Sequence, residues 1–91
     1  MMTGPLNVAL AFYFRRPKSH YRTGKNKYML KDNAPEQHVS TPDLDNLVKF
    51  VCDSYNNHFY KDDSQIVEIR AEKHYIEIND FPRTEVMIDG N

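Results

Sequence analysis

The alternation of apolar and polar residues predicts three β-strands. In residues 6–14 every second side chain is large and apolar, as expected of a strand with one buried face. The same period returns in residues 65–73, where Val67, Ile69 and Ala71 alternate with charged residues, and again in residues 84–89. We therefore expect one strand near the start of the chain and two in its second half.

Helical spacing replaces this alternation in residues 41–57. The apolar face of the predicted helix carries Leu44, Leu47, Val48, Val51 and Tyr55. Thr41 is suited to capping the first turn and Pro42 to occupying it. Asp43 and Asp45 would interact favourably with the positive end of the helix dipole. The helix is thus expected to begin at Thr41 and to end near Asn56.

Residues 15–40 show neither period. They contain Pro17, Gly24 and Pro35 and form a predicted loop of about 25 residues, far longer than the ~4 to 6 residues typical of compact domains. Loops of that length are usually functional or mobile. The predicted order is strand, long loop, helix, strand and strand.

The 91 residues are enough for a single domain. Its apolar content is low, because only 33 residues are aliphatic, phenylalanine, methionine, cysteine or glycine, about 36% against a usual ~45 to 50%. We therefore expect an obligate oligomer. The lone Cys52 excludes an intramolecular disulfide, and no uncharged stretch reaches the ~20 residues of a membrane span. These features predict an intracellular, cytoplasmic protein without membrane contact.

A net charge of −1 conceals an uneven distribution. Residues 1–41 carry seven basic and two acidic residues, whereas residues 42–91 carry five basic and eleven acidic ones. All seven N-terminal cations lie between residues 15 and 31, a segment without acid. Such a positive segment attracts polyanions whatever the total charge. Interleaved Tyr21, Tyr28 and His20 favour contact with nucleic acid, with a merely solvated loop as the alternative.

Two groups of carboxylates flank the predicted helix. Asp43 and Asp45 stand at its start, and Asp62 and Asp63 precede the second strand. Mg²⁺ is typically held by carboxylate, phosphate and water oxygens. The two groups meet at one ion only if residues 56–60 lead the chain back along the helix. On spacing alone, ordinary helix capping and turn formation are the favoured interpretation.

The full set of motifs favours a functional role for these acids over ordinary capping and turn formation. Residues 42–73 contain the string Pro42-Asp-Leu-Asp-Asn-Leu-Val-Lys49, then Asp53, then Tyr60-Lys-Asp-Asp-Ser-Gln-Ile66 and Lys73. This arrangement resembles the RusA family of Holliday junction resolvases and the related phage endodeoxyribonucleases. The family pattern is Asp-Leu-Asp-Asn-Leu-x-Lys, an Asp four residues later, and Asp-Asp-x-Gln followed by Ile or Val. The resemblance is specific over residues 42–73 and weaker over residues 5–14.

The resemblance implies an α+β fold: a small mixed sheet of about three strands with one main helix packed on it, in a homodimer. It also implies a bacterial or phage-encoded, Mg²⁺-dependent endonuclease that resolves four-way (Holliday) junctions by paired nicks. The catalytic and metal-binding residues that match by motif position are Asp43, Asp45 and Asp63, with the essential lysine at Lys49 and Asp62 as a further metal-binding candidate. Asp53 and Gln65 match recurrent positions where we expect structural hydrogen bonds.

The basic loop is expected to bind the branched DNA. The candidate contacts, including one cation from the second strand, are Arg15, Arg16, Lys18, Arg22, Lys25, Lys27 and Lys73. No predicted helix carries this charge, so we expect selection of DNA shape rather than sequence. Family members usually have a strand and a helix ahead of these elements, and the chain therefore looks like a short form with an exposed sheet edge. The alternative hypothesis is a catalytically silent nucleic-acid-binding or assembly protein derived from the same fold.

Overall fold

Three strands and one helix make up the regular structure of residues 1–90, the part of the chain that the computed structural model describes. Strand β1 spans Leu6–Phe14, helix α1 spans Leu44–Tyr55, and strands β2 and β3 span Ile66–Tyr75 and Arg83–Gly90. Short 3₁₀ turns lie at Lys18–His20, Gly24–Asn26 and Asp63–Gln65. The predicted α+β fold is confirmed. In these 90 residues, no helix has the length and apolar character needed to cross a membrane.

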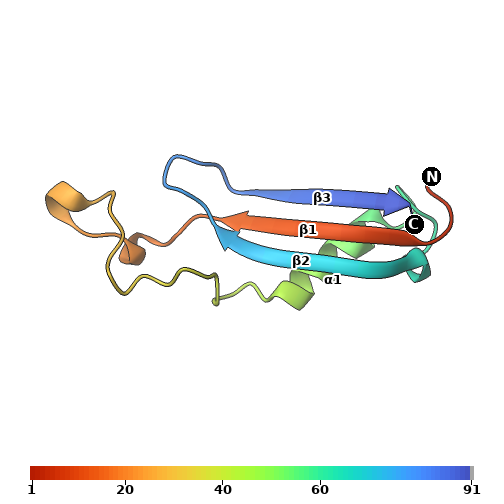
Figure 1. Cartoon of the computed structure of the whole chain (residues 1–91), viewed down its shortest axis with the longest axis horizontal. Helices are drawn as coiled ribbons and strands as arrows, with labels where there is room; N and C mark the ends of the chain where they lie inside the picture. Colours follow the sequence, from red (N-terminus) through yellow and green to blue (C-terminus); the bar gives the residue numbers. More distant parts are fainter. Residues whose placement is uncertain (91) are drawn as a thin grey trace.

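The sheet is mixed and has the strand order β2-β1-β3 (Figure 1). β1 lies in the centre, parallel to β2 and antiparallel to β3. The segment containing α1 connects the two parallel strands, which cannot be joined by a short hairpin. β2 and β3 are therefore the two edge strands of the described sheet.

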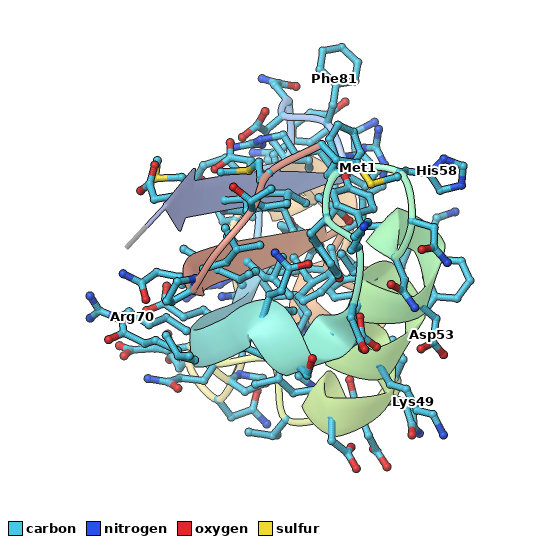
Figure 2. All side chains as sticks on the ribbon, turned by 90° about the vertical axis from the view of Figure 1, so that its right-hand side faces the viewer. Met1, Lys49, Asp53, His58, Arg70 and Phe81 are labelled. Atoms are coloured by element: carbon cyan, nitrogen blue, oxygen red, sulfur yellow. The ribbon has the colours of Figure 1, made fainter. Side chains whose placement is uncertain are left out.

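One face of the sheet packs against α1 and forms the core. The buried residues of β1 are Leu6, Val8, Leu10 and Phe12. Val51 of α1 completes the buried cluster, and the other apolar residues predicted for the helix face pack around it. Lys49 and Asp53 project from the side of α1 that faces away from the sheet, and Arg70 projects from the opposite face of the sheet (Figure 2). The two faces thus differ in character, as the alternation in the sequence predicts.

The helix begins later than the sequence predicted. Asp43, not Thr41, is the N-cap residue, with extended backbone angles of φ −71° and ψ 141°. A tertiary contact is the reason, because the Lys73 ammonium on β2 donates to the carbonyl oxygens of Ser40 and Pro42 at 2.7 and 3.0 Å. These contacts hold the segment before α1 against the sheet in a non-helical conformation.

Residues 15–43 leave the sheet as an ordered arm, called the basic arm below. Its outer part is a short hairpin, in which the Arg22 amide donates to the Met29 carbonyl at 2.8 Å and the Lys31 amide to the His20 carbonyl at 2.9 Å. The basic arm extends from the end of the sheet where β1 and β2 finish (Figure 1). It gives the molecule an elongated shape with extents of 54 × 20 × 19 Å.

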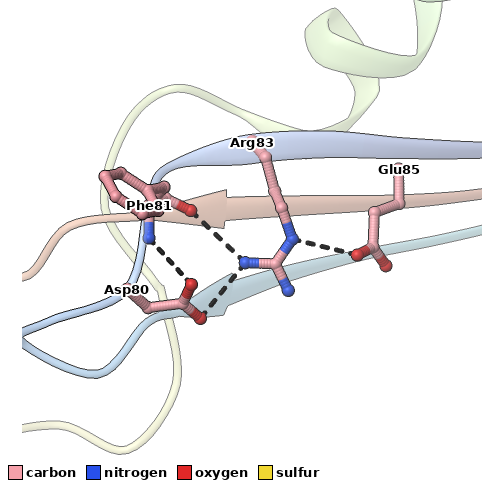
Figure 3. A network of polar contacts seen from close by, with 4 residues as sticks. All are labelled: Asp80, Phe81, Arg83 and Glu85. Carbon is pink, nitrogen blue, oxygen red and sulfur yellow. Dashed lines mark hydrogen bonds and ion pairs between the residues drawn. The ribbon is translucent and has the colours of Figure 1, made fainter.

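Arg83 fixes the start of β3 (Figure 3). Its guanidinium donates to the Asp80 carboxylate at 3.2 Å, the Phe81 carbonyl oxygen at 3.3 Å and the Glu85 carboxylate at 2.9 Å. The hydrogen bond from the Phe81 amide and the contact with Arg83 lower the pKa of Asp80. The guanidinium also lies 4.0 Å from the centre of the Tyr13 ring on β1. These contacts order the connection between β2 and β3.

Candidate functional site

The first group of candidate residues lies at the start of α1. Asp43 makes no capping hydrogen bond through its side chain, and Asp45 and Lys49 follow on the exposed surface of the helix. Within residues 1–90 none of these three side chains forms a hydrogen bond or an ion pair, and Asp53 also lacks the hydrogen bonds expected of it. Lys73, a predicted DNA contact, is instead engaged by the two carbonyl groups before α1. The uncommitted carboxylates at this end of the helix, those of Asp43 and Asp45, thus make no polar contact with the rest of residues 1–90.

The second group lies just before β2, and the Asp62 side chain of this group is held in a hydrogen bond. The Asp62 carboxylate caps the short turn there by accepting a hydrogen bond from the Ser64 amide at 3.2 Å. Gln65 accepts hydrogen bonds from two backbone amides of the same turn. Its side-chain amide donates to the carbonyl oxygens of Met2 and Gly4 at 3.2 and 3.1 Å. The structural role expected of Gln65 is confirmed, and Asp62 has a structural role as well.

Asp63 is placed differently from its neighbour. Its side chain is half-buried, and its Oδ1 atom is buried without a hydrogen-bond partner among the described residues. It lies beside Cys52 and Tyr60, whose hydroxyl donates to the Cys52 carbonyl oxygen at 3.0 Å. Burial raises the pKa of both the Cys52 thiol and the Tyr60 hydroxyl, and the Asp63 carboxylate raises each pKa further. A buried carboxylate oxygen without a hydrogen-bond partner is unfavourable, and Asp63 is the candidate carboxylate with an oxygen in that position.

The two groups of carboxylates do not come together within one chain. Residues 56–60 form a tight turn, in which the Asn57 amide donates to the Tyr60 carbonyl at 2.7 Å. The chain therefore enters β2 at the end of α1 and does not run back to its start. Asp63 precedes β2, whereas Lys73 holds the start of α1 near the other end of that strand, roughly 20 Å away at ~3.3 Å per residue. No three His, Cys, Asp or Glu side chains in residues 1–90 are placed to hold one metal ion.

The cations of the basic arm fall into two sets. Arg16 lies 4.5 Å from the centre of the Tyr75 ring and donates to a carbonyl oxygen of the arm, and Arg22 forms an ion pair with Asp32 at 2.9 Å. The cations whose side chains form no hydrogen bond or ion pair within the described chain are Arg15, Lys18, Lys25, Lys27 and Lys31. An open cavity of about 590 Å³ is lined by three of these free cations and by both tyrosines of the arm. This cavity has the charge and the aromatic surface that suit a nucleic-acid backbone.

Sequence reasoning missed His38, which anchors the base of the arm. Its ring is buried between those of Phe14 and Tyr75, with centroid distances of 4.6 and 4.7 Å. Burial, reinforced by the positive charge of Lys73, lowers the pKa of His38. A single histidine in an irregular segment has no periodic signal, so only the packing distinguishes it from the other histidines.

Comparisons with known proteins identify relatives over nearly the whole chain. The model of the family described as Endodeoxyribonuclease RusA matches residues 1–89. The chain is 39% identical over 88 residues to the uncharacterized protein YqaN of Bacillus subtilis (strain 168), an alignment that covers 97% of this chain and 59% of that protein. The chain thus spans about three fifths of the length of this curated relative. No solved structure gave a significant match.

Proposed function

The chain belongs to the RusA family of endodeoxyribonucleases, and from this premise we propose that it is a Mg²⁺-dependent, structure-selective endonuclease. Its proposed substrate is the four-way DNA junction, which it resolves by paired nicks as a homodimer inside the cell. The proposed reaction class, hydrolysis of DNA by an endonuclease, rests on the family match. The substrate and the ion are inferred from the surface that the chain presents.

One structural observation supports this proposal most strongly. The free cations of the basic arm and the uncommitted Asp43 and Asp45 lie at the same end of the sheet, because Lys73 fixes the segment that joins them. Phosphates bound along the arm would therefore bring a DNA strand towards these carboxylates. No helix carries the positive charge, so recognition of shape through the backbone remains the expectation.

The proposed roles follow the chemistry of each group. Asp43, Asp45 and Asp63 offer the hard oxygen donors that Mg²⁺ prefers, and the unpartnered Oδ1 of Asp63 has acceptor capacity to spare. Bound Mg²⁺ would supply a Lewis acid and a water of lowered pKa. Lys49 would place an ammonium next to the scissile phosphate, where developing negative charge is stabilised. The three carboxylates of one chain are, however, too far apart to hold a single ion.

The experiment that tests this proposal is cleavage of labelled four-way, forked and linear duplex DNA. We expect nicking of the four-way junction in Mg²⁺, no nicking in EDTA, and loss of at least ~100-fold in rate for Asp45→Asn. Asp89→Asn is the matched control, because Asp89 is also exposed but lies at the end of β3. Equal cleavage by wild type and Asp45→Asn would remove this carboxylate from the mechanism.

The second candidate function is binding without cleavage. It is favoured by the separation of the carboxylates within one chain, which leaves each group short of a complete ligand set. Tight, salt-dependent binding of the junction with no nicking in Mg²⁺, Mn²⁺ or Ca²⁺ would support this function against the first.

A further inference from the structure

The cavity of the basic arm has a lining that contact with phosphates alone does not explain. This cavity of about 590 Å³, called the arm cavity below, is bounded by residues of the arm and by residues 76–78 of the β2–β3 connection. The arm and this connection leave the sheet at the same end (Figure 1). Besides its cations, the arm cavity is lined by Tyr21, Tyr28, Ile76, Glu77 and Ile78. A phosphate gains nothing from two isoleucines and is repelled by a carboxylate.

We propose that the arm cavity receives one nucleobase that is unstacked from a DNA strand. The base would stack on Tyr28 and lie against the two isoleucines, while the phosphates next to it would contact the free cations. Glu77 would accept a hydrogen bond from an amino group on the edge of the base. This inference deepens the proposed function, because it states which part of a branched substrate the arm binds, and it rests on that function only for the identity of the substrate.

Tyr28 offers the stacking surface. Its side chain is 66% exposed and lines the arm cavity. The Lys27 ammonium lies 5.1 Å from the centre of the ring and can cover only one of its two faces. Bases of single strands are commonly bound by stacking on an exposed aromatic ring, with cations nearby for the backbone. The pair Lys27 and Tyr28 thus has the chemistry of a base with its adjoining phosphate.

Ile76 distinguishes an unpaired base from a duplex as the ligand. Its side chain is only 6% exposed, and its amide donates to the Phe14 carbonyl at 3.0 Å, which fixes it to the end of β1. Only a group that enters the arm cavity can contact a side chain buried to this extent. In a regular duplex the bases are stacked and paired, and moving one out is least unfavourable where it is already unpaired. A single strand or a branch point supplies such bases.

Glu77 gives the arm cavity a means to distinguish bases. It is the only acid in the lining, it is exposed, and its carboxylate forms no hydrogen bond or ion pair within residues 1–90. A carboxylate accepts hydrogen bonds from base amino groups, such as the N4 amino group of cytosine. Uracil and thymine instead offer an N–H flanked by two carbonyl oxygens, which repel a carboxylate. We therefore expect bases with an amino group to bind more tightly than uracil or thymine.

The hairpin of the basic arm holds the two tyrosines in place before any ligand binds. Tyr21 forms an antiparallel bridge with Leu30, and the Arg22 amide donates to the Met29 carbonyl at 2.8 Å. Gly24 adopts a positive φ of 71° in the turn between the tyrosines, a conformation that favours glycine. A site held by its own backbone hydrogen bonds loses little conformational freedom on binding.

The first test compares single-stranded with duplex DNA. Fluorescence anisotropy in EDTA, with labelled strands and duplexes of about 12 nucleotides, measures both affinities in the absence of a divalent ion. Tyr28→Leu should lower the affinity for the single strand by roughly 5- to 150-fold, the range for loss of one base–aromatic stack. It should leave the affinity for the duplex nearly unchanged. Tyr28→Phe keeps the ring and should bind as the wild type does.

The matched control is Phe81→Leu. Phe81 is an aromatic residue of the same β2–β3 connection and is 72% exposed, but it does not line the arm cavity. Circular dichroism should show that Tyr28→Leu is folded, because the Tyr28 side chain is largely exposed. An equal loss of single-strand and duplex binding in Tyr28→Leu, or no loss at all, would overturn the proposed base site.

The second test measures the preference between oligodeoxycytidine and oligodeoxyuridine, whose bases differ in the group at C4. The wild type should bind the cytidine strand at least ~5-fold more tightly. Glu77→Ala should bind both strands more tightly, because a negative charge is removed, but should lose the preference. Glu36→Ala is the matched control, because Glu36 is an exposed acid of the arm outside the arm cavity, and it should keep the preference. No preference in the wild type, or the same preference in Glu77→Ala, would overturn the contact between Glu77 and the base.

A competition experiment distinguishes a DNA strand from a free nucleotide, which has the same chemistry. Deoxycytidine monophosphate should displace the labelled strand only at concentrations at least ~100-fold higher than the unlabelled strand, because it offers one phosphate. Equal competition would make the arm cavity a mononucleotide site and overturn the proposal. These measurements need no cleavage. Base preference without nicking would refute the proposed nuclease alone, whereas nicking without any effect of Tyr28→Leu on single-strand binding would refute the base site alone.

Discussion

The buried His38 ring couples the stability of the fold to pH at the scale of a single residue. Its pKa in the folded chain lies below the ordinary value of 6.5, mainly because of burial and partly because of Lys73, with His20 adding to the effect. The unfolded chain therefore binds the proton more strongly than the folded chain. Stability is fully present above pH 6.5 and decreases as the pH falls below it, with a limit of ~1.4 kcal/mol per pH unit for one proton.

We expect His38→Gln to flatten this decrease. Urea unfolding measures the free energy of unfolding at pH 7.5 and at pH 5.5. The difference between these two free energies should be smaller in the variant than in the wild type. His58→Gln is the control, because His58 is exposed. If His38→Gln and wild type lost equal stability on acidification, another group would be responsible.

Lys49 allows catalysis to be separated from stability. Its side chain is exposed and has no ion pair within residues 1–90, so Lys49→Ala should change the free energy of unfolding by no more than ~0.5 kcal/mol. Loss of one electrostatic contact to the transition state should slow cleavage by at least ~100-fold at saturating Mg²⁺, while junction binding persists. Lys61→Ala, at another exposed lysine, should retain wild-type rates. Full recovery of Lys49→Ala by added Mg²⁺ would mean that the lysine only balances nearby negative charge.

At the scale of elements, the basic arm divides its cations between folding and binding. Arg16 and Arg22 donate hydrogen bonds within the protein, whereas the side chains of Lys18, Lys25, Lys27 and Lys31 form no hydrogen bond or ion pair among the described residues. Each phosphate contact adds about 0.9 to the slope of log K against log salt. Replacing Lys18, Lys25 and Lys27 with alanine should therefore reduce the slope by up to ~2.7 without destabilising the fold.

Fluorescence anisotropy with a labelled junction over a range of salt concentrations measures this slope. Arg16→Ala is the informative contrast, because it removes the stacking on Tyr75 and a hydrogen bond within the arm. It should lower the melting temperature as well as the affinity. An unchanged slope in the triple lysine variant would place the DNA on another surface.

At the scale of the whole molecule, the proposed homodimer would cover apolar surface that one copy leaves exposed. Val67 and Ile69 on β2 and Met87 on β3 are 60%, 44% and 61% exposed on the two edge strands. Exposed apolar residues on an unpaired strand favour association. We therefore expect a dimer at micromolar concentration.

Analytical ultracentrifugation measures the mass of the species in solution and tests this expectation. A stable, folded monomer at micromolar concentration would contradict the proposed homodimer.

The sequence by itself determined the features that depend on near neighbours along the chain. The period of two in β1 predicted its bounds, Leu6–Phe14, because one buried face requires every second side chain to be apolar. The period of the helix likewise predicted which residues of α1 pack on the sheet. The order of the acidic motifs indicated the family, and the charge of residues 15–31 indicated a surface for polyanions.

Only the tertiary structure decided how residues distant in sequence are placed. The hydrogen bonds from Lys73 moved the start of α1 to Leu44, and the turn at residues 56–60 kept Asp63 at the far end of β2 from the other acids. Packing made His38 structural and selected which cations remain free. These outcomes depend on strand pairing and on contacts between segments, for which no local period in the sequence exists.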